Sequence, residues 1–204
     1  LRGGGRGYPP GASPTRSIVE VIPLLIVLAL VVIVGIVAVV MYNGLVRLRN
    51  KIDGAFAQID VQLNRRHDLI PNLVETVKGY AAHESKTLEA VVAARNQATA
   101  ATGTAEKAQA ENMLTDALKS LFAVAEAYPD LKANQGFQQL QSQLAETEDR
   151  IAFARQYFND NVRIYNTKVQ TFPTMFLARM GGFTEREYFE ADETSRQNVQ
   201  VKFD

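Results

Sequence analysis

The densest cluster of reactive side chains in this 204-residue sequence is Arg65-Arg66-His67-Asp68. As a catalytic group, His67 would act as a general base oriented by Asp68, and the two arginines would hold an anion. As a structural group, Arg66 would lie on the apolar stripe of a helix and pair with a carboxylate of another helix, while Asp68 would cap a segment that begins near Pro71. Adjacent helical residues point about 100° apart, which places His67 and Asp68 poorly for a dyad. The structural interpretation is therefore favoured.

A second candidate motif is His83-Glu84, which begins like the HExxH zinc helix. Thr87 stands where the second histidine would be, so the motif lacks a ligand. The sequence also contains no Glu-x-x-His pair, no Gly-rich phosphate loop and no GxSxG elbow. We therefore expect no catalytic residue, no bound cofactor and no metal site, and a protein that is not an enzyme.

Composition excludes further classes. The 22 Lys and Arg residues balance 22 Asp and Glu, which argues against a nucleic-acid partner. With no cysteine, the chain has no disulfide and no Cys-ligated metal site. The charge run Glu146, Glu148, Asp149 and Arg150 is interpreted as the solvated face of a helix.

The elements that position these residues begin with a membrane span, predicted at residues 21–42 and ending at Val21 and Tyr42. No charged residue occurs between Glu20 and Arg47, and roughly 20 apolar residues cross a hydrocarbon core of about 30 Å. The alternative, a cleaved signal peptide, usually has a shorter apolar core of about 7–15 residues. Basic residues are nearly balanced on the two sides of the span, with a slight lean toward a cytoplasmic C-terminal domain.

Residues 1–20 form a predicted tail rich in Gly, Pro and Arg. The tail has almost nothing to bury, so alone in water it should be disordered. Ordering each residue costs about 1–2 kcal/mol, so we expect order there only where other copies or partners cover it.

Helical periodicity dominates residues 43–172, the predicted bundle domain. Apolar residues recur every three or four positions, and breaks are indicated at Pro71, at 98–104 and at Pro129. If the chain turns at Pro71, the domain is an antiparallel up-and-down four-helix bundle whose first three helices have similar lengths. If the prolines only kink the chain, it is one long α-hairpin. The bundle is favoured because four helices bury a shared core.

Residues 173–204 form a C-terminal region with an apolar patch at 175–183. The patch could cap the bundle or lie on the bilayer surface, and capping is favoured because interfacial helices usually carry more basic residues. Thr184 and Glu187 have the spacing of a capping box and predict a short helix. Val199, Val201 and Phe203 alternate like an edge strand.

Long motifs in this chain resemble the LemA family of bacterial single-pass membrane proteins. They are YNGLVRLRNKIDGAFAQIDVQLNRRHDLIPNLVETVKGYAAHE (42–84), YPDLKANQGFQQLQSQLAETEDRIAFARQYFNDNVRIYN (128–166) and FP…GGF…REYFE (172–190). The resemblance implies an all-α fold with an N-terminal transmembrane helix that continues into the bundle. It also implies a bacterial inner (cell) membrane location, with the N-terminus outside and the bundle in the cytoplasm. It supplies no catalytic residue, only structural signature positions: Arg65, Arg66, His67, Asp68, Pro71 and Asn72.

Two functions are expected from these features. The first is a non-enzymatic, membrane-anchored scaffold that self-assembles as a homo-oligomer and organises membrane lipid or membrane proteins. The second is an adaptor whose cytoplasmic bundle binds a membrane enzyme such as a protease.

Overall fold

The structure is a computed structural model that describes residues 14–189 of the chain. All secondary structure in this part is helical, which confirms the all-α prediction. The chain forms two compact units, Leu1–Gly44 and Leu45–Asp204. The predicted strand at 199–203 and most of the predicted tail lie outside the described residues, although α1 already begins at Pro14. The helices are α1 (Pro14–Lys78), α2 (Ser85–Ala100), α3 (Thr104–Ala125), α4 (Pro129–Ala133), α5 (Gln135–Gln170) and α6 (Thr174–Met180).

In the first unit, α1 is apolar on every side from Val21 to Met41. None of its most apolar window is buried, and the side chains from Val21 to Val40 include long stretches of exposed Leu, Ile and Val. This segment is long and apolar enough to cross a membrane, which agrees with the predicted span. Tyr42, at the predicted end of the span, is 43 % exposed.

The prediction that the chain turns at Pro71 is wrong, because α1 continues without interruption to Lys78. Proline has no N–H to donate to the carbonyl four residues earlier, which here belongs to His67. That carbonyl instead accepts a hydrogen bond from Nε of Arg95 on α2, at 2.8 Å. A side chain from a neighbouring helix thus replaces the missing backbone donor, and the turn comes only at 79–84.

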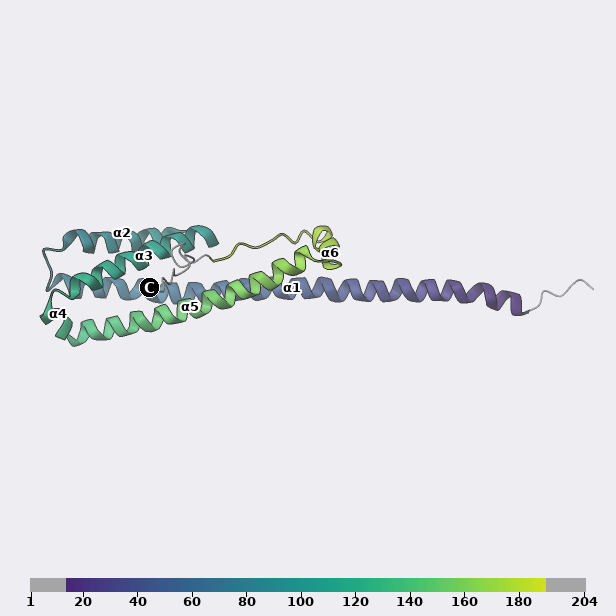
Figure 1. The fold of residues 1–204 in the computed structure, drawn as a ribbon, viewed down its shortest axis with the longest axis horizontal. Coiled ribbons are helices and arrows are strands. Elements are labelled where there is room, and N and C mark those ends of the chain that lie inside the picture. The colour runs from purple at the N-terminus through teal and green to yellow at the C-terminus, as the bar shows by residue number, and fades with distance from the viewer. Residues whose placement is uncertain (1–13, 190–204) are drawn as a thin grey trace, which may run out of the picture. The chain divides into compact units, whose positions relative to one another are not determined.

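The second unit is an up-and-down bundle of the C-terminal part of α1 with α2, α3 and α5 (Figure 1). The expected breaks near 98–104 and Pro129 are present, and Gly103 has a positive φ of 80° in the α2–α3 connection. The expectation of similar helix lengths is wrong: α2 has 16 residues and α3 has 22, against 36 in α5. Consequently α2 and α3 accompany only part of α5.

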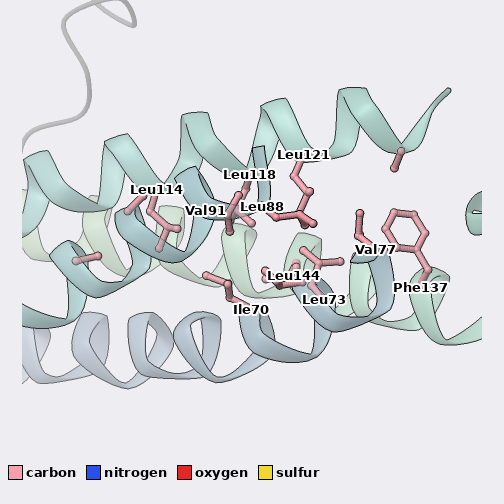
Figure 2. Packing of buried hydrophobic residues seen from close by; sticks show 14 of the residues in the cluster. Ile70, Leu73, Val77, Leu88, Val91, Leu114, Leu118, Leu121, Phe137 and Leu144 are labelled. Carbon is pink, nitrogen blue, oxygen red and sulfur yellow. The ribbon is translucent and has the colours of Figure 1, made fainter. Parts of the chain in front are cut away.

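The unequal lengths divide the interior into two cores. The distal core lies in the half that contains α4 and draws side chains from all four long helices (Figure 2). The proximal core lies in the half that contains Leu45 and is built mainly from α1 and α5. Its buried members are Leu45, Ile52, Ala55, Ile59, Leu63, Ala108, Ile151, Phe158, Val162, Tyr165, Ala178, Phe183 and Phe189.

An extended segment at 183–189, which we call the strap, covers the proximal core. The expected helix at Thr184 is therefore wrong. The amide of Asn166 pairs with the backbone N–H and carbonyl of Arg186, and that of Asn159 pairs in the same way with Phe189 (all 2.9–3.0 Å).

The spacing of these two asparagines explains why the strap is extended. Seven helical residues advance about 10.5 Å, and three extended residues advance about 10 Å. Asn159 and Asn166 therefore match Phe189 and Arg186 only if the strap is extended and runs antiparallel to α5. The two asparagine side chains thus bind backbone groups of the strap that a neighbouring strand would otherwise bind.

Candidate functional site

The candidate site is a buried polar cluster formed by Arg66, His67 and Glu111, between residues of the two cores. Arg66 and Glu111 are each 2 % exposed and His67 is 6 % exposed. Arg66 and His67 come from α1, where they interrupt the apolar stripe between Leu63 and Ile70.

The guanidinium of Arg66 binds two other helices. Its Nη1 donates to Oγ1 of Thr115 on α3 at 3.0 Å and to Oε2 of Glu148 on α5 at 2.7 Å. Its Nη2 donates to the backbone carbonyl of Glu111 at 3.1 Å and to the carboxylate of the same residue. The prediction that Arg66 pairs with a carboxylate of another helix is confirmed, and two carboxylates are involved.

His67 completes the cluster through its Nε2, which lies 2.8 Å from Oε1 of Glu111. Burial would raise the pKa of the Glu111 carboxyl, but the hydrogen bond to His67 and the positive charge of Arg66 together lower that pKa below its usual value. Glu111 is therefore held as a carboxylate between two partners.

The remaining two helices are tied in at the same level. Arg95 on α2 binds the carbonyl of His67, as described above. Partial burial lowers the pKa of the Arg155 guanidinium on α5, which also interacts electrostatically with Glu148, Arg66 and Glu111. Each long helix of the bundle thus contributes a charged side chain to one level of the structure.

The geometry of the cluster suits ion pairing between helices better than catalysis. Arg66, His67 and Glu111 face one another and are almost wholly shielded, so a substrate would reach them only if helices separated. In the described part of the chain, no group of three or more His, Asp or Glu side chains could hold a metal ion.

The family model that matches this chain is that of the LemA family, over residues 55–203. This chain belongs to the LemA family. The resemblance drawn from the sequence motifs is thereby confirmed, and the match includes the whole polar cluster.

Three curated relatives are similar to this LemA-family chain over most of its length. Magnetosome protein MamQ of Magnetospirillum gryphiswaldense is 26 % identical over 205 residues, covering 87 % of this chain and 75 % of the relative. Magnetosome protein MamQ 2 of Paramagnetospirillum magneticum is 26 % identical over 194 residues, with coverages of 81 % and 71 %. Protein LemA of Metamycoplasma hominis is 27 % identical over 161 residues, with coverages of 77 % and 72 %.

The signature residues of this LemA-family chain separate into two groups. Arg66 and His67 point inward, whereas Asp68, Pro71 and Asn72 are exposed on α1. The side chain of Arg65 is 44 % exposed and lies 3.8 Å from the carboxylate of Glu146. Since α1 continues through Pro71, no helix begins there, and the expectation that Asp68 caps one is wrong.

Sequence reasoning missed Glu111 and misjudged Glu148. Glu111 lies on the same stripe as Leu114, Leu118 and Leu121, and a carboxylate at a core position of a helix was the available signal. Glu148 was assigned with its neighbours to a solvated face, yet it is only 45 % exposed and reaches Arg66. The local charge run gave no indication of that partner.

Proposed function

We propose that this LemA-family chain is a non-enzymatic, membrane-anchored scaffold that self-assembles. The observation that carries the proposal is an exposed stripe on α5, formed by Phe153, Tyr157 and Ile164. These side chains are 73, 44 and 40 % exposed. They share one face because four and eleven residues correspond to nearly whole turns of an α-helix. A large apolar stripe that stays exposed on a helix of the core is typical of an interaction surface.

A groove beside this stripe supports contact between two copies. It has a volume of about 640 Å³ and is lined by Gln58 and Gln62 of α1 together with residues of α5 from Glu146 to Tyr157. The lining includes the acids Glu146 and Asp149 and the base Arg150. In a two-fold contact, Phe153 of each copy would enter the groove of the other.

The chemistry of the stripe fits such a contact. Aromatic side chains are enriched at the centres of protein interfaces, and full burial of a Phe side chain is worth about 1.5–3 kcal/mol. The closed polar cluster supports a role without catalysis or cofactor. Two relatives are magnetosome proteins, and neither is named for a reaction.

The proposed location is a bacterial inner membrane, with membrane lipid as the first partner. The exposed apolar helix from Val21 supports a single-pass anchor. The N-terminus would lie outside and the bundle in the cytoplasm, as the family resemblance implies. The scaffold would then organise lipids or membrane proteins around an array of copies, with no nucleic acid involved.

The test is particle mass in native membrane discs extracted by polymer, for the full chain and for Phe153→Ser. Met113→Ser is the matched control, because Met113 is an exposed apolar residue on α3. We expect a defined oligomer for the full chain and for Met113→Ser, and a smaller particle for Phe153→Ser. A chain lacking residues 1–17 tests in the same way whether the tail takes part in assembly.

Two results would contradict self-assembly. One is a monomer for the full chain. The other is a one-to-one complex with a different protein that Phe153→Ser disrupts, which would favour the adaptor function instead.

A further inference from the structure

A second exposed apolar surface occurs at α6 and is separate from the α5 stripe. It consists of Phe172, Phe176 and Met180, which we call the α6 patch. These side chains are 79, 53 and 86 % exposed. The rings of Phe172 and Phe176 lie edge to face with centroids 6.2 Å apart, so the patch is continuous.

The opposite side of α6 is already buried. Ala178 has no exposed surface, and Phe183, just after the helix, is 5 % exposed in the proximal core. The predicted capping of the bundle therefore involves only one side of α6, the side with Ala178. The α6 patch points away from the core that α6 covers.

At this end of the bundle basic residues outnumber acidic ones, and the nearby acid Asp53 is paired with Arg186. The segments 44–52 and 164–182 contain no Asp or Glu. They contain five exposed basic residues, and the ammonium of Lys51 lies over the ring of Tyr157 on the α5 stripe. We call the other four the basic collar: Arg47, Arg49, Lys168 and Arg179. The collar is drawn from α1, α5 and α6, so no single element is strongly basic.

Residues of α1 that share the core with α6 follow the apolar segment closely along the chain. Leu45 is buried in the same core as Ala178 and Phe183, and the guanidinium carbon of Arg49 lies 5.5 Å from the centroid of the Phe183 ring. Leu45 is four positions after Met41, so the two residues are at most about 14 Å apart in any chain conformation. A bilayer adds about 5–8 Å of headgroup region on each side of its hydrocarbon core.

We propose that the α6 patch inserts into the surface of the bilayer that α1 spans, with the basic collar bound to anionic headgroups. Interfacial helices bury an apolar face at the boundary between headgroups and acyl chains, and nearby basic residues add attraction to anionic lipid. A second copy of the chain is a poorer occupant, because it would bring a second collar of the same sign. The proposal does not depend on self-assembly, since a monomer would insert in the same way.

The experiment uses the full chain, which has no cysteine, in vesicles. Met180→Cys and the control Met113→Cys are each labelled with an environment-sensitive fluorophore. The vesicles contain phosphatidylcholine with or without phosphatidylglycerol, and a lipid spin-labelled near the headgroup serves as quencher. Both methionines are exposed, so neither substitution removes a core contact.

We expect the label at position 180 to lose most of its fluorescence to the spin-labelled lipid, and the label at 113 to lose little. Phosphatidylglycerol should deepen the loss at 180, and Lys168→Glu with Arg179→Glu should reverse that effect. A label at 180 that stays water-exposed would overturn the proposal. So would one that is shielded only at high protein density and never quenched by lipid, since that result identifies a contact between copies.

Discussion

Arg65 and Arg66 are neighbours in the chain, yet α1 carries their side chains into opposite environments. Arg66 is 2 % exposed and contacts Glu111, Thr115 and Glu148. Arg65 is 44 % exposed and lies 3.8 Å from the carboxylate of Glu146. Breaking a buried ion pair leaves a charge without compensation, while an exposed pair is screened by water. The two positions therefore form a matched pair for measuring what the polar cluster contributes.

We expect Arg66→Ala to lower the free energy of unfolding by roughly 3–5 kcal/mol and Arg65→Ala by less than about 1 kcal/mol. Urea denaturation of the full chain in detergent, followed by the near-ultraviolet circular dichroism of its tyrosines, which include buried Tyr165, would measure both. Equal effects would mean that the cluster has no special role in stability.

Glu111 makes this stability depend on pH. Its pKa is lowered from 4.5 in the folded chain, so the folded state favours the carboxylate more than the unfolded state does. This contribution is fully present above the unfolded pKa and is lost as pH falls through the folded pKa. We expect the urea concentration at the unfolding midpoint to decrease when the pH is lowered below about 4.5. The Glu111→Gln chain should be less stable at pH 7, and its stability should change less with acid. A parallel acid dependence in both chains would exclude Glu111 as the cause.

At the scale of elements, α1 continues through Pro71 because α2 lies beside it. The carbonyl of His67 loses its usual backbone donor, and Arg95 supplies another at 2.8 Å. The continuity of one helix thus depends on a side chain of the next. Pro71 and Arg95 should consequently be coupled in energy.

A double-mutant cycle tests that coupling. Arg95→Met should cost about 1.5–3 kcal/mol in the natural background, as for a hydrogen bond from a charged group. In a Pro71→Ala chain the new N–H can bind the His67 carbonyl, so the same change should cost at least about 1 kcal/mol less. Urea midpoints of the four chains give the coupling, and additive effects would refute the explanation.

At the scale of the whole bundle, the two halves are closed by different elements. In the distal half, α2 and α3 complete a shared core with α1 and α5. In the proximal half, α6 and the strap contribute Ala178, Phe183 and Phe189 over α1 and α5. Because Asn159 and Asn166 hold the strap, opening it should affect the proximal core first.

Asn166→Asp removes the amide donor to the Arg186 carbonyl, and Asn96→Asp makes the same change on the exposed surface of α2. Losing about 1–1.5 kcal/mol of hydrogen bonding should speed tryptic cleavage after Arg186 by roughly five- to tenfold. Cleavage should be unchanged in Asn96→Asp. Hydrogen exchange should rise around Phe158 and Tyr165 and stay constant around Leu114 and Leu121. Uniform loss of protection would show that the strap supports both halves equally.

The sequence by itself determined the helical class, the apolar segment at 21–42, the family and the breaks near 98–104 and Pro129. These features depend on local propensity and on periodicity within one helix, which neighbouring residues already express. It also indicated that Arg66 needs a carboxylate, because a charge on an apolar stripe requires a partner. It could not name that partner.

Only the tertiary structure decided which distant groups meet. His67 and Glu111 are 44 residues apart, Arg95 and His67 are 28 apart, and Asn159 and Phe189 are 30 apart. The packing of helices and strap brings these groups together, and packing depends on the whole core rather than on any segment. For the same reason Pro71 remains helical, the strap is extended, and the basic collar combines residues from three separate helices.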